Sequence, residues 1–136
     1  MNRRQAREKA LQAIFQMNTG ETSSEEAMSH VLEDQPSDPF FEQLVITAAE
    51  HFDDIDTLIK KYLDKWPFHR LGHIDKAILR LAVCELLYFE NIPVKVTLNE
   101  AIELAKTFGD DDTRRFTNGV LSTLAGQESL HKQEGT

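Results

Sequence analysis

Asn99-Glu-Ala-Ile-Glu-Leu-Ala-Lys-Thr-Phe-Gly109 is the stretch that decides the fold class of this chain. Its apolar residues recur at helical spacing, Thr97-Leu-Asn-Glu100 forms a capping box that predicts a helix start, and Gly109 predicts its end. Asp110-Asp-Asp-Thr113 then predicts the cap of a last helix, which carries Arg115-Phe-Thr-Asn-Gly-Val-Leu121. Two consecutive helices with their own start and stop signals indicate a helical domain.

Helical periodicity also dominates the rest of the sequence, and no strand-like alternation persists. We therefore expect an all-α fold, a compact bundle of six or seven helices without an internal repeat. The first helix is expected from about Arg3 to Asn18, and Gly126 is expected to end the last one. Between them we predict helices over residues 25–32, 39–65 with a kink near 53–54, and 75–89, a helical turn over 68–72, and caps at Ser23 or Ser24 and at Ser37 or Asp38.

Length and composition indicate one domain, spanning residues 1–136, with a polar tail from about residue 127. No apolar run approaches the roughly 20 residues that a membrane helix needs, and no secretory signal pattern follows the first residues. Cys84 is the single cysteine, so it forms no internal disulfide, and a reducing cytoplasm is the expected compartment.

Taken over the whole chain, the net charge of −8 argues against nucleic-acid binding, but the charges are unevenly distributed along the sequence. Residues 1–20 carry Arg3, Arg4, Arg7 and Lys9 against Glu8 alone, whereas residues 21–59 carry eleven carboxylates and no lysine or arginine. A local basic patch is what meets phosphate, and an acidic remainder limits nonspecific binding. On charge alone, a solvated helix end explains the arginines equally well.

The sequence offers no constellation typical of an enzyme. It has no phosphate-binding loop, dinucleotide-binding turn or nucleophile elbow. His69 and His73 have the spacing of zinc ligands on a helix, but Gly72 interrupts the turn and further ligands are missing, so we predict no metal site. Cys84 lies in the most apolar segment, where a buried thiol is expected. We predict a protein without catalytic residues and without a cofactor.

Glu85 is unusual because its neighbours in the predicted 75–89 helix are apolar or aromatic, Tyr88 among them. Burying an unpaired carboxylate costs several kcal/mol. Either Glu85 has an internal partner, or it faces a partner protein. The residues themselves leave both alternatives open.

Arg114 and Arg115, at the start of the last helix, also have two explanations. They can pair with Asp110–Asp112, or they can meet phosphate beside the first helix. In the second case Phe15 and Phe116 are available to stack on bases of single-stranded RNA. That hypothesis requires the first turn of the first helix and the segment Asp112–Phe116 to lie side by side.

The chain resembles the NusB family of bacterial transcription antitermination factors from Arg3 to about Leu124. The similarity is carried by several blocks in a fixed order: Ala6-Arg-Glu-Lys-Ala-Leu-Gln-Ala-Ile-Phe15, Asp75-Lys-Ala-Ile-Leu-Arg-Leu-Ala82, Ile92-Pro93, Asn99–Gly109 and Phe116–Leu121. The resemblance implies two three-helix subdomains and binding to the boxA element of nascent RNA. It also implies a partner, the small-subunit ribosomal protein NusE, and action on the RNA polymerase elongation complex, notably in ribosomal RNA operons.

The resemblance also assigns roles by position. Arg3, Arg4 and Arg7 match the RNA-contacting start of the family, and Phe15 falls where relatives often carry tyrosine near the RNA. Asp112, Thr113, Arg114, Arg115 and Phe116 match a second RNA-proximal segment. Glu85 matches a position at the partner-protein interface, and we assign Tyr88 to the same surface.

The sequence departs from the family pattern at three positions. Cys84 replaces a common aromatic residue, Phe15 lacks the tyrosine hydroxyl, and Ser122 replaces a common acidic or amide residue. Two other functions remain open: a non-enzymatic helical protein–protein adaptor, or the RNA-binding module of a ribosomal RNA methyltransferase. The sequence leaves open whether the chain is a monomer or a homodimer.

Overall fold

The computed structural model describes residues 1–64 and 66–130. Within these residues the chain folds into seven α-helices and one 3-10 turn, which confirms the all-α prediction. The elements are α1 (Arg3–Met17), α2 (Ser24–Leu32), α3 (Pro39–Glu50), α4 (Phe52–Lys61), η1 (Phe68–Arg70), α5 (His73–Tyr88), α6 (Val94–Phe108) and α7 (Asp111–Gln127). None of these helices is long and apolar enough to cross a membrane. Part of the expected polar tail, residues 131–136, lies outside the described residues.

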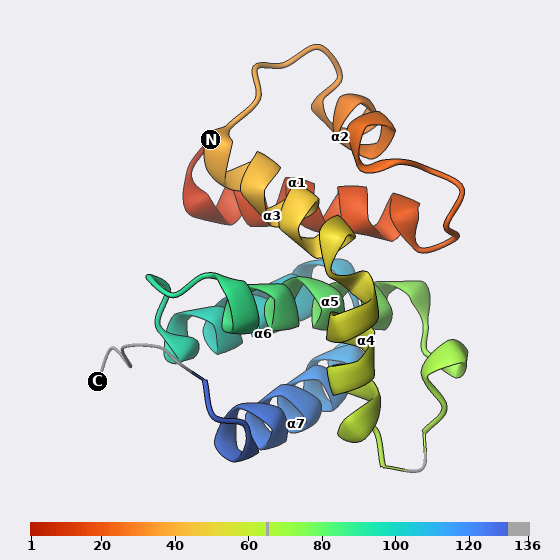
Figure 1. The fold of residues 1–136 in the computed structure, drawn as a ribbon, viewed down its shortest axis with the longest axis vertical. Helices are drawn as coiled ribbons and strands as arrows, with labels where there is room; N and C mark the ends of the chain where they lie inside the picture. Colours follow the sequence, from red (N-terminus) through yellow and green to blue (C-terminus); the bar gives the residue numbers. More distant parts are fainter. Residues whose placement is uncertain (65, 131–136) are drawn as a thin grey trace.

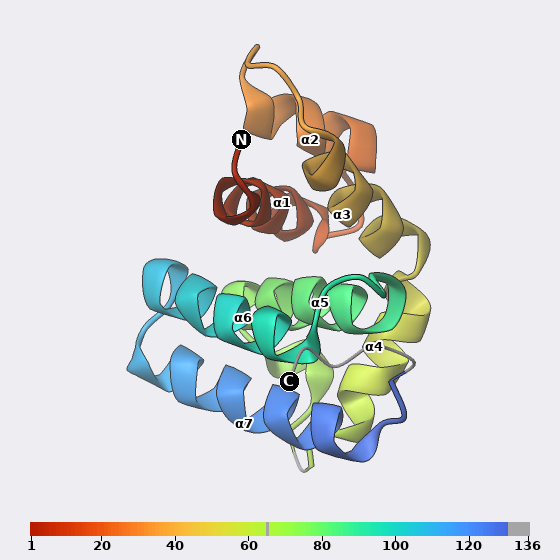
Figure 2. The same ribbon diagram turned by 90° about the vertical axis from the view of Figure 1, so that its left-hand side faces the viewer.

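The helices form two groups. Figure 1 shows α1, α2 and α3 in the upper part of the molecule and α4, α5, α6 and α7 in the lower part, and Figure 2 shows the same division from the side. Helix α5 lies at the junction and packs against α1, α3, α4, α6 and α7. Every residue from Ala77 to Leu86 is buried, so this helix occupies the centre of the fold.

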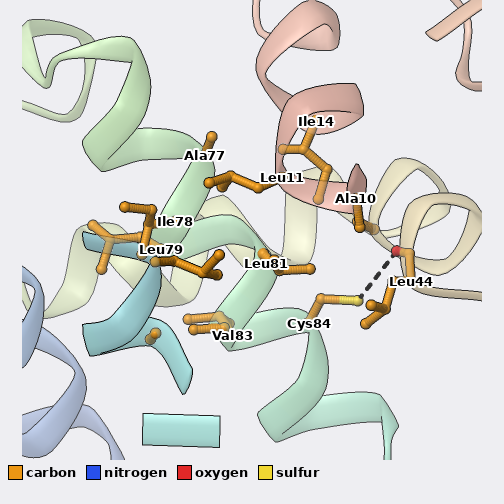
Figure 3. Close-up of a cluster of buried hydrophobic side chains, with 14 of the residues drawn as sticks. Ala10, Leu11, Ile14, Leu44, Ala77, Ile78, Leu79, Leu81, Val83 and Cys84 are labelled. Carbon is orange, nitrogen blue, oxygen red and sulfur yellow. Dashed lines mark hydrogen bonds between the residues drawn. The ribbon is translucent and has the colours of Figure 1, made fainter. Parts of the chain in front are cut away.

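A single hydrophobic core connects the two groups. In Figure 3, Leu11 and Ile14 of α1 point toward α5, and Leu44 of α3 lies opposite Cys84. The Cys84 thiol donates to the carbonyl oxygen of Leu44 at 3.9 Å. Burial raises the pKa of the Cys84 thiol to about 12, so this cysteine is a packing residue as expected.

The helix predicted over residues 39–65, with a kink near 53–54, is two separate helices, because the chain breaks at His51 and α4 ends at Lys61. The His51 backbone (φ −123°, ψ 18°) leaves the helical region, and its N–H donates to Ala48 rather than continuing the helix. The His51 ring stacks on Tyr88 of α5, with ring centroids 4.1 Å apart. The break lets α3 join the upper group while α4 joins the lower group, which therefore holds four helices rather than three.

Two other predicted boundaries are wrong. Helix α6 begins at Val94, after Pro93, so Thr97 lies in its first turns and does not cap it. The Thr97 hydroxyl instead donates to Glu85 at 3.1 Å. Gly126 lies inside α7, which continues to Gln127.

Most of the predicted caps are confirmed. Ser23, Asp38 and Asp110 accept hydrogen bonds from the first turns of α2, α3 and α7. Gly109 ends α6, and a Cβ at this position would lie 2.6 Å from Thr113, so the turn into α7 requires glycine. Helix α1 begins with a capping box that was not predicted, in which Asn2 and Gln5 form reciprocal hydrogen bonds.

Candidate nucleic-acid interface

The exposed arginines of the first turn of α1 carry the basic charge expected from the sequence. Arg3 lies over the ring of Phe40, with its guanidinium carbon 3.8 Å from the ring centroid. Arg4 pairs with Glu100 of α6 at 2.9 Å, yet its side chain stays 60% exposed. Both guanidinium groups therefore remain available to solvent and to an anionic ligand.

Arg7 does not belong to this exposed surface, although it is only one turn further along α1. It is 4% exposed. Its Nε and Nη2 atoms donate to the two carboxylate oxygens of Glu85, at 2.8 and 2.9 Å, in a bidentate pair. A third charged group, Glu100, has its Oε1 atom 3.6 Å from Nη1 of Arg7. In this structure Arg7 is therefore paired inside the protein, and its assignment to the RNA surface stays a prediction.

The same pair bears on the two alternatives for Glu85. This carboxylate is 2% exposed, and it accepts from Arg7 of α1 and from Thr97 of α6. Glu85 therefore has internal partners, and its assignment to a partner-protein interface stays a prediction. Helical periodicity correctly placed Glu85 on an apolar helix. It could not reveal that Arg7 of α1 packs against the same face of that helix.

Tyr88 occupies a more open position than Glu85. It is half-buried, stacks on His51, and lines a groove together with Arg3, Phe40 and Phe89. Burial and the nearby charge of Asp54 raise the pKa of its phenol, so it stays neutral near pH 7. No contact tests its assignment to a partner surface.

Phe15 lies at the other end of α1 from the arginines. It is 41% exposed, an unusual state for a large aromatic side chain, and its ring meets His73 of α5 edge to face at 5.9 Å. Asn18 ties the same end of α1 to α5, because its Nδ2 donates to the carbonyl oxygen of His73 at 3.0 Å. Phe15 is thus held beside the start of α5.

The start of α7 presents alternating charges. Asp110 caps the helix through the backbone N–H of Thr113, which lowers the pKa of its carboxyl group. Arg115 pairs with Asp112 at 2.7 Å, and Arg114 approaches Asp111 at 4.0 Å. These pairs are strongly exposed, and such surface pairs contribute little to stability.

The expected neighbourhood of the two segments is only partly seen. Arg4 and Arg7 face α6, where Glu100 and Thr107 line a small pocket with them. Within residues 1–64 and 66–130, no hydrogen bond, ion pair or ring contact joins Arg3, Arg4 or Arg7 to the segment Asp112–Phe116. The C-terminal end of α1 lies nearer to the segment Asp112–Phe116. Phe15 contacts His73, and the residue before His73, Gly72, lines a pocket with Thr113 and Phe116. The candidate RNA surface therefore extends along α1, from Arg3 and Arg4 at its start to Phe15 near its end.

Three residues around that last pocket were not predicted from the sequence as site residues: Trp66, Arg70 and Asp75. Trp66 is 56% exposed, and a lone tryptophan in a polar turn was the available signal. Burial raises the pKa of the Asp75 carboxyl group, and the nearby Asp110 charge adds to the shift while a hydrogen bond with Thr113 opposes it. Among the described residues, no group of three His, Cys, Asp or Glu side chains could hold a metal ion.

Comparisons with known proteins agree with the fold and with the sequence blocks. The profile of the NusB family matches residues 4–126. The chain is 53% identical over 124 residues to the transcription antitermination protein NusB of Bacillus subtilis, covering 91% of this chain and 95% of that protein. It is 50% identical over 128 residues to NusB of Lysinibacillus sphaericus, covering 94% of this chain and all of that protein.

Two solved structures are similar over the same range. T. maritima NusB superposes with a TM-score of 0.85 at 34% identity, covering 94% of this chain and 93% of that chain. A chain in the crystal structure of antitermination factors NusB and NusE in complex with dsRNA superposes with a TM-score of 0.81 at 27% identity. That match covers 94% of this chain and all of the other.

Proposed function

Because this chain belongs to the NusB family, we propose that it is a transcription antitermination factor that binds RNA together with NusE. The RNA is the boxA element of a nascent transcript, and the complex acts on the RNA polymerase elongation complex. The observation that carries the proposal is the solved NusB–NusE complex with RNA, whose matching chain shares this fold over its whole length. Action on RNA polymerase places the protein in the cytoplasm and requires no covalent chemistry of its own.

The proposed RNA surface runs along α1 to the start of α7. Arg3 and Arg4 contact phosphate, and Phe15 and Phe116 stack on unpaired bases. The second segment, Asp112–Phe116, adds polar contacts through Thr113, Arg114 and Arg115. The carboxylate of Asp112 reduces the positive charge of this segment. Arg7 acts indirectly, because its pair with Glu85 fixes the orientation of α1 that presents Arg3 and Arg4. Tyr88 stays our candidate for contact with the protein partner.

The variant Arg3→Ala/Arg4→Ala is expected to weaken binding to boxA RNA and to reduce its salt dependence. Each phosphate contact contributes roughly 0.7 to the slope of log K against log salt for a single strand, so two contacts contribute about 1.4. Fluorescence anisotropy with labelled boxA RNA and a scrambled RNA, with and without NusE, measures both quantities. Folding stability should change little, because both side chains are exposed.

Lys61→Ala is the matched control for that experiment. It removes one positive charge from the end of α4, where Lys61 pairs with Glu128. Figure 1 and Figure 2 show α4 well away from the start of α1. A slope that falls equally in the control and in the arginine variant would contradict the assignment of Arg3 and Arg4. Salt-independent binding to any RNA would contradict the proposed function itself and favour a protein–protein adaptor.

Asp112→Asn is expected to strengthen RNA binding by a few-fold. The substitution removes a negative charge and releases Arg115, which now pairs with Asp112 at 2.7 Å, for contact with phosphate. The cost to α7 should be small, because Asp110 and not Asp112 caps the helix. The dissociation constant at two salt concentrations and a thermal melt test both statements. Weaker binding by a fully folded variant would remove Asp112 from the RNA surface.

A further inference from the structure

Asn18, the residue directly after α1, forms hydrogen bonds through both ends of its side-chain amide. Its Nδ2 atom donates to the backbone carbonyl oxygen of His73, the first residue of α5, at 3.0 Å. Its Oδ1 atom accepts from Nη1 of Arg80, further along α5, at 2.8 Å. Because a guanidinium can only donate and a carbonyl oxygen can only accept, these two partners fix the orientation of the amide.

The support on which Asn18 rests is itself held by two helices. Nε and Nη2 of Arg80 donate to the two carboxylate oxygens of Asp56 in α4, at 2.8 and 2.7 Å. The side chains of Arg80 and Asp56 are 10% and 16% exposed, so solvent competes little for this pair. Asn18 therefore attaches the end of α1 to a fixed group built from α4 and α5.

The same attachment fixes the surroundings of Phe15. The backbone N–H of Asn18 donates to the carbonyl oxygen of Phe15 at 3.2 Å, so the two residues share the last turn of the helix. The Phe15 ring is 41% exposed and meets the His73 ring at 5.9 Å, its single ring contact among residues 1–64 and 66–130. His73 thus receives both the ring of Phe15 and the amide of Asn18.

Helix α1 is attached to the lower group of helices near both of its ends. The buried pair of Arg7 with Glu85 attaches its first turns, and Asn18 attaches its end. At 1.5 Å per residue, Arg7 and Asn18 are about 16 Å apart along the helix axis. Two attachments at this separation oppose rotation of α1 about its axis, and the second one lies beside Phe15.

We propose that Asn18 is a positioning residue for RNA binding, whose hydrogen bond to the His73 carbonyl oxygen holds the Phe15 ring in the orientation that stacks on a base. The inference rests on the proposed function, in which Phe15 stacks on RNA, and adds to it a residue that itself touches no RNA. A ring that is already ordered in the free protein binds more tightly, because less conformational entropy is lost on binding.

A double-mutant cycle with Phe15 separates positioning from a general structural role. Phe15→Ala should weaken binding of labelled boxA RNA, measured by anisotropy with NusE present, by about tenfold. Asn18→Ala should weaken it about threefold, because the ring is present but no longer held. In the Phe15→Ala background, Asn18→Ala should cause no further loss of RNA affinity. It should still lower the urea midpoint in both backgrounds, because Arg80 loses an acceptor.

Asn18→Asp separates the two hydrogen bonds of the amide. Aspartate still accepts from Arg80 but cannot donate to the His73 carbonyl oxygen. We expect a urea midpoint close to that of the wild type together with weaker RNA binding. The added negative charge also repels RNA, but that effect is screened by salt and persists in the Phe15→Ala background, so the cycle separates it from positioning.

Gln16→Ala is the matched control, because it removes an amide from the same end of α1. The Oε1 atom of Gln16 lies 3.2 Å from Nδ1 of His30 in α2 and does not contact α5. RNA affinity should stay unchanged in this variant. In NMR spectra of the free chain, the ring protons of His73 should shift in Phe15→Ala and Asn18→Ala, as the ring contact is lost, and keep their wild-type positions in Gln16→Ala.

Three results would overturn the proposal: an equal loss of RNA affinity from Asn18→Ala in both backgrounds, wild-type RNA affinity in Asn18→Asp, or wild-type RNA affinity in Phe15→Ala. Each of them leaves the proposed function intact, provided that the wild-type chain binds boxA RNA with NusE. Failure of the wild-type chain to bind boxA RNA under the same conditions would instead contradict the proposed function itself.

Discussion

Glu85→Ala is expected to lower the free energy of unfolding by about 3–5 kcal/mol, the usual cost of removing one member of a buried ion pair. The Arg7 guanidinium would remain in the interior, 4% exposed, without the two carboxylate oxygens that it now contacts. The Thr97 hydroxyl would also lose its acceptor. Urea denaturation followed by circular dichroism measures the loss.

Three further variants test the origin of this effect. Glu90→Ala removes an exposed carboxylate just after α5 and should change stability by less than about 0.5 kcal/mol. Arg7→Met/Glu85→Leu replaces the pair by apolar side chains and should recover most of the loss, because no charge then stays buried. Arg7→Ala alone should be about as harmful as Glu85→Ala. If Glu85→Ala unfolds at the wild-type urea concentration but binds NusE poorly, Glu85 acts at the partner interface after all.

Arg80→Ala is expected to lower the free energy of unfolding by about 2–4 kcal/mol, because Arg80 holds three helices together. Its Nε and Nη2 atoms donate to the two oxygens of Asp56 in α4, at 2.8 and 2.7 Å. Its Nη1 atom donates to Asn18, after the end of α1, at 2.8 Å. The guanidinium carbon also lies 4.5 Å from the centroid of the Phe52 ring. The pair is 10% and 16% exposed, so we expect a smaller loss than at Glu85.

Arg80→Lys should restore only part of the stability, since one ammonium group cannot reproduce the planar contacts with Asp56 and Asn18. Arg70→Ala is the matched control, because Arg70 is exposed and forms no ion pair with any described residue. The end of α1 should also loosen in Arg80→Ala, which hydrogen exchange at residues 14–18 can detect. Equal urea midpoints for Arg80→Ala and Arg70→Ala would show that the Arg80 contacts contribute nothing measurable.

The Arg7–Glu85 pair explains how the basic start of α1 can contribute to folding as well as to the RNA binding that we propose. Arg3 and Arg4 are exposed, while Arg7 enters the core one turn later and bonds to Glu85. A substitution of all three arginines would therefore confuse lost RNA contacts with lost stability. The separate variants Arg3→Ala/Arg4→Ala and Glu85→Ala distinguish these effects.

The sequence by itself determined the local features of the fold. Helical periodicity located the apolar stripes, and short-range hydrogen-bonding residues such as Ser23, Asp38 and Asp110 marked the helix starts. These signals suffice because they act over three or four neighbouring residues. The same local reasoning located the basic charge of Arg3 and Arg4 and the family blocks that the comparisons confirm. It gave the pairing of Arg115 with a nearby aspartate as one of two alternatives, and the structure shows that pair.

Only the tertiary structure decided which residues meet across the chain. Arg7 and Glu85 are 78 positions apart, and periodicity gives the direction of each side chain but not the helix that faces it. The sequence predicted a kink near 53–54, but the stacking of His51 on Tyr88 at the observed break joins two distant segments that no local pattern relates. Asp75 and Phe116 come together because α5 and α7 pack side by side, so the pocket that they line with Trp66 exists only in the folded chain.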